Sequence, residues 1–133
     1  MKYLLDTNMV IAISKKQPNI IHQIRQHRPS DFALSSIVYF ELAFGAHNSQ
    51  KVRENMQILE QLPFEILPFN QNDALQAGKI RADLKQKGTS IGVYDVLIAG
   101  QAIAQELVLI THNVKEFERV EGLRFEDWLG LVK

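Results

Sequence analysis

The feature that most constrains the fold is a short apolar run near the start of the chain that stops at a carboxylate. Tyr3–Leu5 precede Asp6, and Thr7 and Asn8 follow it. A continuous apolar run of this length is typical of a strand buried on both faces, as strands are in parallel sheets. Ligands of open parallel sheets bind just beyond the carboxyl ends of the strands, where Asp6 is expected, while Thr7 and Asn8 are expected to cap the next helix. Asp6 is alternatively a simple turn or capping residue, and this stretch alone leaves both interpretations open.

The rest of the chain alternates between strand-like and helix-like segments. Further strands are predicted over residues 32–34, 64–67, 107–110 and 123–125, the last at an edge of the sheet. Helices are predicted after residue 8, around residues 20–25, and over residues 35–47, 49–62, 72–87 and 93–105, with Ser49 as a cap and with Leu75, Ile80 and Leu84 facing the core. Strands that alternate with helices imply an α/β fold whose parallel sheet is covered on both faces. We find no repeat, linker or low-complexity tract and therefore predict a single domain over residues 1–133.

Composition excludes several classes of function. The chain has no cysteine, which rules out disulfides, thiolate catalysis and zinc sites built on cysteine. Its net charge is zero, so any binding of nucleic acid depends on local basic patches rather than on overall charge. Met1 leads almost directly into a strand and no apolar run reaches the length of a membrane span, so we expect a cytoplasmic protein with no membrane association.

Two carboxylates lie in otherwise uncharged helical stretches. Glu41 is the only charged residue of residues 37–44, and Asp95 is the only one of residues 92–99. Ionised carboxylates are rarely buried unless they are paired or coordinate an ion, because desolvation costs several kcal/mol. The structural alternatives are an exposed glutamate on the outer helix face and an aspartate that stabilises a helix N-terminus.

A fourth polar side chain, Asn113, follows the apolar strand predicted over residues 107–110 and is alternatively a helix cap. If the strands are neighbours, Asp6, Glu41, Asp95 and Asn113 converge at one rim of the sheet. Two carboxylates ~4 Å apart repel each other by about 4 kcal/mol at an effective dielectric near 20. Such a cluster requires either a cation or raised pKa values. Oxygen ligands without cysteine suit Mg²⁺ or Mn²⁺, ions that commonly act on phosphates.

Four ordered blocks of this sequence resemble PIN-domain proteins, and among them the VapC-type toxins of bacterial VapBC toxin–antitoxin modules. The blocks span nearly the whole chain and cover residues 4–8, 35–42, 91–99 and 109–117. The resemblance implies a three-layer α/β sandwich with a mainly parallel central sheet. It also implies a metal-dependent endoribonuclease that cleaves structured RNA such as tRNA and is neutralised by a cognate VapB-type antitoxin.

The resemblance also implies roles for particular residues. Asp6, Glu41 and Asp95 match the acidic triad of the family, whereas Asn113 stands where many PIN domains carry a fourth acid. This departure puts a second tightly held metal ion in doubt. Asp6 and Asp95 are expected to be the principal ligands of Mg²⁺ or Mn²⁺, and Glu41 to act through water or as a general base. Thr7 and Thr111 match positions whose hydroxyls orient water or substrate. His112 is not part of the resemblance, but its position beside the proposed site makes it a candidate substrate contact.

Basic and apolar residues outside this cluster suggest partners. Five basic residues are candidate contacts to RNA phosphates, namely Lys15, Lys16, Arg81, Lys85 and Lys87. Each basic cluster is equally compatible with a solvated helix face. Five apolar residues cannot easily all face the sheet and are expected to mark an interface, namely Tyr39, Phe40, Phe44, Ile58 and Leu59. We expect a homodimer and an antitoxin that lies across the acidic pocket.

Two other functions remain open at the level of sequence. The chain could be a non-catalytic PIN-like module that binds RNA or protein. It could also be a receiver or phosphatase-like domain in which Asp6 accepts a phosphoryl group. Receivers typically pair acids after the first strand and carry a lysine after a late strand, whereas here Asp6 is followed by Thr7 and the strand over residues 107–110 by Thr111 and His112.

Overall fold

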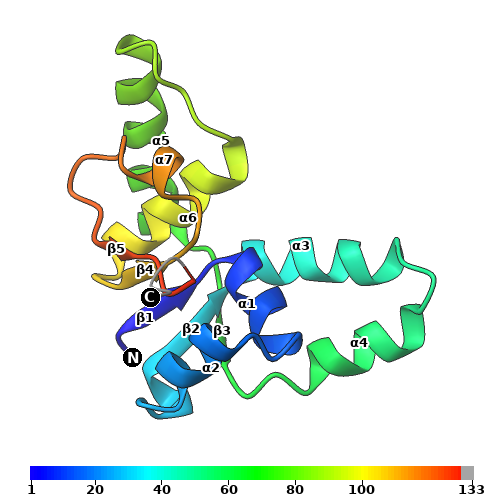
Figure 1. Ribbon diagram of the computed structural model, residues 1–133. Coiled ribbons are helices and arrows are strands. Elements are labelled where there is room, and N and C mark those ends of the chain that lie inside the picture. The colour runs from blue at the N-terminus through cyan, green and yellow to red at the C-terminus, as the bar shows by residue number, and fades with distance from the viewer. Residues whose placement is uncertain (130–133) are drawn as a thin grey trace.

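A computed structural model describes residues 1–129 as a five-stranded sheet flanked by helices (Figure 1). The strands are β1 (Tyr3–Leu5), β2 (Phe32–Ser35), β3 (Glu65–Leu67), β4 (Val108–Ile110) and β5 (Phe125–Glu126). The helices are α1 (Thr7–Ser14), α2 (Pro18–Ile24), α3 (Ser36–His47), α4 (Val52–Glu60), α5 (Gln71–Gln86), α6 (Val93–Ala104) and α7 (Val114–Phe117), with a short 3₁₀ turn at Pro29–Asp31. All four strand pairings are parallel, which confirms the predicted α/β fold class.

The strand order β3-β2-β1-β4-β5 places a reversal of chain direction beside β1. From β1 the chain moves outward through β2 to β3, and then returns by α5 and α6 to β4 on the other side of β1. Crossovers between parallel strands are almost always right-handed, so the two directions place their helices on opposite faces of the sheet. The carboxyl ends of β1 and β4 therefore flank the point where open α/β sheets bind ligands.

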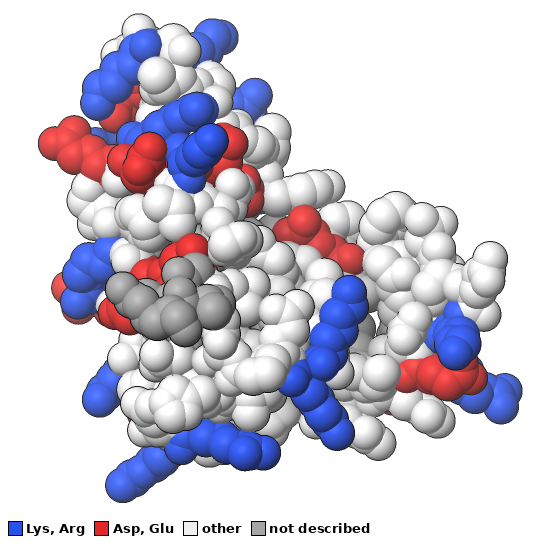
Figure 2. Space-filling model, viewed as in Figure 1, with Lys and Arg blue, Asp and Glu red and all other residues white. Residues whose placement is uncertain are grey.

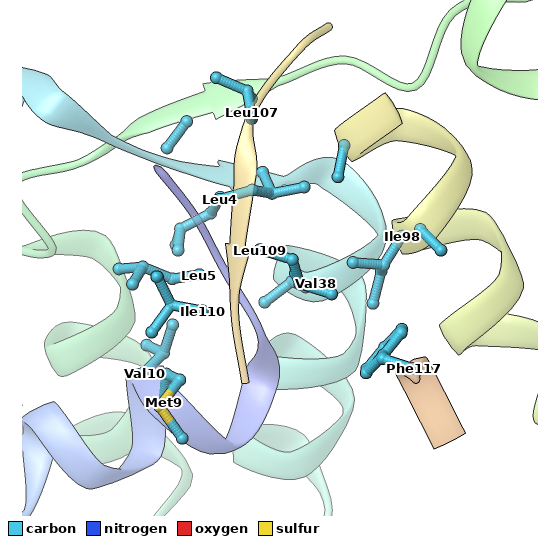
Figure 3. Packing of buried hydrophobic residues seen from close by; sticks show 14 of the residues in the cluster. Leu4, Leu5, Met9, Val10, Val38, Ile98, Leu107, Leu109, Ile110 and Phe117 are labelled. Atoms are coloured by element: carbon cyan, nitrogen blue, oxygen red, sulfur yellow. The ribbon is translucent and has the colours of Figure 1, made fainter. Parts of the chain in front are cut away.

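The adjacent strands β1 and β4 are buried on both faces of the sheet. Leu4 and Leu5 have no exposed surface, although successive side chains of a strand point to opposite faces. Figure 3 shows Leu5 and Ile110 on the side of α1, while Leu109 lies on the other side with Ile98. This double burial explains the uninterrupted apolar runs of the two strands.

Two helical arms extend from the sheet. The hairpin of α3 and α4 forms one arm, and α5 packed against α6 forms the other (Figure 1). In the second arm the helices approach so closely that a Cβ atom at Gly100 would lie 2.6 Å from the backbone nitrogen of Ala77. A residue without a Cβ atom is therefore required at position 100 for this packing.

The structure corrects four local expectations. Leu75 is 66% exposed, because α5 buries Asp73, Ala77, Ile80 and Leu84 at a helical spacing that excludes position 75. The last strand covers residues 125–126 rather than 123–125, although it does lie at an edge.

The other two corrections concern helix caps. Asp6 is itself the N-cap of α1, accepting a hydrogen bond from the backbone nitrogen of Thr7, so Thr7 and Asn8 are not the caps. Ser49 does not cap α4, whose N-cap is Lys51 without a side-chain hydrogen bond. The Ser49 hydroxyl instead donates to the carbonyl of Ala46 and accepts from the Asn55 amide. Within residues 1–129, no helix has the length and apolar character needed to span a bilayer.

Candidate active site at the carboxyl end of the sheet

The topology brings the predicted polar residues to one rim of the sheet. Asp6 follows β1 directly, and Asn113 lies three residues after the end of β4. Glu41 lies in the second turn of α3, and Asp95 lies in the first turn of α6. Figure 2 shows acidic atoms in the notch between the two arms, with uncharged surface on either side.

Asp6 is the most buried member of this acidic cluster, which comprises Asp6, Glu41 and Asp95. Its side chain is 5% exposed, and its Oδ2 atom accepts a hydrogen bond of 2.8 Å from the buried Thr111 hydroxyl. Its Oδ1 atom accepts from the backbone nitrogen of Thr7, also at 2.8 Å. Burial raises the pKa of Asp6, and these two hydrogen bonds partly oppose the rise. The Asn113 backbone nitrogen donates to the Thr111 hydroxyl at 3.0 Å and so fixes the donor that holds Asp6.

Thr7 links Glu41 to Asp6 by donating a hydrogen bond to each of the two carboxylates. The Thr7 hydroxyl donates to Oε1 of Glu41 at 3.1 Å, while the Thr7 backbone donates to Asp6. Desolvation raises the pKa of Glu41, the hydrogen bond from Thr7 lowers it, and repulsion by Asp6 raises it further. Thr7 therefore sets the separation of two carboxylates that repel each other.

Asp95 shows the effect of the cluster most clearly. Burial, followed by repulsion from Asp6, Glu41 and Glu116, raises the pKa of Asp95 to about 6. The Asn113 side-chain amide donates to Oδ2 of Asp95 at 3.0 Å and partly opposes this rise. Asn113 is the N-cap residue of α7 by position, but its side chain makes no capping bond and serves Asp95 instead.

Glu116 is the residue of this region that the sequence analysis missed. It lies in α7, is half-buried and stands near enough to Asp95 to affect its pKa, while its Oε2 atom is 3.6 Å from a guanidinium nitrogen of Arg119. Its position three residues after Asn113, in the last of the four sequence blocks, is the signal that points to it.

The carboxylates of the acidic cluster are suitable ligands for a hard divalent cation, although their side chains are not arranged around a common ion position. The donors that hold Asp6, Glu41 and Asp95 are hydroxyl, amide and backbone N–H groups. Carboxylate oxygens with raised pKa values are the ligands that Mg²⁺ or Mn²⁺ would stabilise in the ionised form. In the part of the chain that the structure describes, no three Asp, Glu, His or Cys side chains are grouped closely enough to hold a metal ion. A cation held by this cluster would therefore require small movements of the half-buried Glu41 and Asp95 side chains.

The five basic residues predicted to contact RNA lie in separate places. Lys15 lines a cavity of ≈ 330 Å³ between α1, α3 and α4 that also includes Thr7 and Glu41. Lys16 lies outside this cavity, beside α2. Arg81 and Lys85 share a cavity beside α5, whereas Lys87 forms ion pairs with Asp83 and Glu121 at 3.1 and 3.8 Å.

The residues predicted to form an interface differ in their exposure to solvent. Phe40, Phe44 and Ile58 are 54%, 62% and 47% exposed, as expected of an interface, but Leu59 is buried in the fold and Tyr39 is half-buried. His112 is exposed, and its Nδ1 atom lies 3.0 Å from Oδ2 of Asp127.

Comparisons with known proteins agree with this fold. Residues 3–123 match the PIN domain. The tRNA(fMet)-specific endonuclease VapC of Salmonella typhimurium is 39% identical over 130 residues, which cover 96% of this chain and 98% of that protein. Ribonuclease VapC1 of Haemophilus influenzae is 40% identical over 132 residues, with 96% and 98% coverage. The crystal structure of DNA-bound VapBC from Salmonella typhimurium superposes with a TM-score of 0.90 at 38% identity, covering 96% of this chain and 98% of that one.

Proposed function

The chain belongs to the PIN-domain family, and we propose that it is a VapC-type endoribonuclease toxin that cleaves structured RNA with the help of Mg²⁺ or Mn²⁺. The observation that carries this proposal is the acidic cluster at the carboxyl ends of β1 and β4, where open α/β sheets bind their ligands. The relatives named as ribonucleases, one of them specific for tRNA(fMet), support RNA as the substrate.

Asp6 and Asp95 would hold the cation, with Glu41 acting directly or through water and Asn113 offering a neutral oxygen. When bound, the cation supplies positive charge that stabilises the charge developing on the scissile phosphate. Thr111 holds Asp6 at 2.8 Å, and the Asn113 amide holds Asp95 at 3.0 Å, so both carboxylates are positioned before substrate arrives.

Glu41 is the residue placed to accept a proton from the attacking water. The pKa of Glu41 is raised and so lies closer to neutral pH than that of an ordinary glutamate, which favours general-base catalysis. The Thr7 hydroxyl donates to Oε1, so Oε2 is the oxygen that would accept this proton. No side-chain nucleophile is needed, and direct attack by water leaves a 5′-phosphate on one product.

The antitoxin is expected to cover the cavity between α1, α3 and α4. Thr7 and Glu41 form part of its lining, while Ile11 and Ile58 add exposed apolar surface. An apolar segment seated there would bury these side chains and block access to Glu41. VapBC complexes among the structural neighbours support such a partner. We also expect a homodimer, to which the exposed Phe40 and Phe44 of α3 contribute.

Cleavage of purified RNA tests the proposed activity. We expect the protein to cut a tRNA(fMet) transcript in the presence of Mg²⁺ or Mn²⁺, to stop in EDTA, and to leave 5′-phosphate ends. Asp6→Asn should lower cleavage by about 10²- to 10³-fold, the loss expected when a principal charge-stabilising group is removed. A protein that binds this RNA but does not cut it would be a non-catalytic module. Transfer of phosphate to Asp6 from a phosphoryl donor would favour the receiver-like alternative.

A further inference from the structure

A second cavity, outside the acidic cluster, is lined by charged residues that are all positive. It has a volume of ≈ 260 Å³ and lies between α5, the loop over residues 87–92 and the first turn of α6. Leu84 and Val96 supply apolar lining, and the charged residues of the lining are Arg81 and Lys85. A concave site with an apolar base and a few convergent charges is typical of a ligand site rather than of a solvated helix face.

The two basic side chains stand four residues apart on α5 and therefore share one face of the helix. Within residues 1–129, neither Arg81 nor Lys85 forms an ion pair. Lys87, just beyond the end of α5, differs because it pairs with Asp83 and Glu121. The positive charge at the cavity is thus left uncompensated by the protein, and like charges at this spacing repel each other.

The wall opposite α5 is fixed in place. The backbone nitrogens of Gly88 and Thr89 donate to the carbonyls of Lys85 and Leu84 at 3.1 and 2.9 Å, which folds the loop back over the end of α5. Gly88 has a φ of +70°, a conformation that glycine adopts without strain. The guanidinium of Arg119 donates to the carbonyl of Ser90 at 3.3 Å and ties the loop to the end of α7. The cavity is therefore formed before any ligand arrives.

We propose that this cavity binds a phosphate of the RNA backbone, with Arg81 and Lys85 as its ligands, and so positions the strand that enters the acidic cluster. This inference rests on the proposed function. An arginine guanidinium can hold two phosphate oxygens at once, and a lysine ammonium adds a mobile charge. Val93 and Val96 place the first turn of α6 in the cavity wall, and Asp95 projects from that same turn. A strand crossing the turn from the cavity to Asp95 spans about one helix diameter, ~10–12 Å.

Charge favours RNA over a protein partner at this site. The chain has no net charge, so a polyanion is attracted only where basic residues are locally unpaired. Figure 2 shows basic side chains interleaved with acidic ones over the arm of α5 and α6, which restricts attraction to the unpaired positions. Contacts of this kind orient RNA without reading its sequence.

The test compares two double variants that remove the same charge and the same two residue types. Arg81→Gln/Lys85→Gln alters the cavity, and Lys51→Gln/Arg53→Gln, at the start of α4 and outside the cavity lining, is the matched control. All four side chains are exposed, and equal melting temperatures would verify that both proteins fold. Binding of the tRNA(fMet) transcript is measured in EDTA over a series of salt concentrations, and cleavage is measured with Mg²⁺.

We expect the cavity variant to bind the transcript about 10- to 100-fold more weakly at low salt. The slope of log K against log salt should fall in magnitude by about 0.7 to 0.9, the value for one lost phosphate contact. KM should rise while kcat at saturating RNA stays the same. The control variant should leave the slope and the affinity nearly unchanged, because Lys51 and Arg53 lie outside the cavity.

Equal losses in the two variants would overturn the proposal in favour of a diffuse electrostatic attraction. Normal RNA binding by the cavity variant would also overturn it, and a selective loss of antitoxin binding would then assign the cavity to the protein partner. Failure of the unaltered protein to bind or cut the transcript would refute the proposed function itself, so the two failures are distinguishable.

Discussion

Replacing Asp95 by asparagine should stabilise the metal-free protein while removing its activity. The pKa of Asp95 rises from 3.8 to about 6 through burial and repulsion by Asp6, Glu41 and Glu116. At 1.36 kcal/mol for each tenfold change in acidity, this rise corresponds to about 3 kcal/mol. Solvent reaches part of the side chain and screens these charges, so we expect about half of this value, ~1.5 kcal/mol, or a melting temperature higher by roughly 5 °C.

The sign follows from proton binding. Because the folded state binds the proton of Asp95 more tightly than the unfolded state does, its stability falls as the pH rises from about 4 to about 6. The variant has an uncharged amide at this position and is free of this loss. The stability difference between Asp95→Asn and the parent should therefore be near zero at pH 4, grow up to about pH 6 and then remain constant.

Urea unfolding in EDTA across this pH range measures the difference. Asp83→Asn is the matched control, since it removes a carboxylate that is paired with Lys87 and should not stabilise the protein. Adding Mn²⁺ should reverse the order, because the parent binds the ion in its folded state and gains stability by mass action. Equal stability of the two proteins at pH 7.5 in EDTA would refute the electrostatic description of the cluster.

Three further substitutions test other parts of the structure. Thr111→Val should destabilise the protein by about 1–3 kcal/mol in urea unfolding, because buried Asp6 loses a hydroxyl donor, whereas Thr111→Ser should be much milder. Gly100→Ala should cost about 1–3 kcal/mol by forcing α5 and α6 apart, while Gly78→Ala, where nothing lies within 4 Å of the added Cβ, should be neutral or stabilising by up to about 1 kcal/mol. Asn113→Asp should destabilise the metal-free protein by about 1–2 kcal/mol near pH 8, because the hydrogen bond from the Asn113 amide to Asp95 is replaced by repulsion between two carboxylates. The added carboxylate should also tighten Mn²⁺ binding in a thermal titration. An unchanged melting point together with unchanged metal affinity would remove Asn113 from the site.

The central part of the fold could be predicted because its sequence pattern has few alternatives. Leu4, Leu5, Leu109 and Ile110 have no exposed surface, and such continuous apolar runs, alternating with helical segments, are typical of a parallel sheet covered by helices on both faces. Such a sheet also determines where Asp6 lies, because the residue after a central strand meets the residues after its neighbour. Glu41 and Asp95 stand out in the sequence as lone charges in apolar helical stretches. The family resemblance joined them to Asp6 as one triad, because distances along the chain carry no information about distances in space.

Pairings between side chains of different elements could not be predicted. The sequence predicts Thr7 as a cap of α1, but Asp6 is the cap and accepts a hydrogen bond from the backbone nitrogen of Thr7. The Thr7 hydroxyl is not used for capping and donates to Glu41 instead. Asn113 was ambiguous between a cap and a site residue, and its orientation toward Asp95 depends on how α7 packs against α6. Leu75 was assigned to the core because apolar character was given more weight than the exact helical spacing of its neighbours.

The most direct measurement locates the cation. Crystals of the protein soaked in Mn²⁺ and measured at a wavelength where manganese scatters anomalously should show a peak between Asp6 and Asp95, within ligand distance of at least one oxygen of each. The same soak of Asp6→Asn crystals should lose or greatly weaken this peak. A manganese peak that avoids this rim in the parent protein, or that persists undiminished in Asp6→Asn, would contradict the assignment of the acidic cluster as the catalytic metal site.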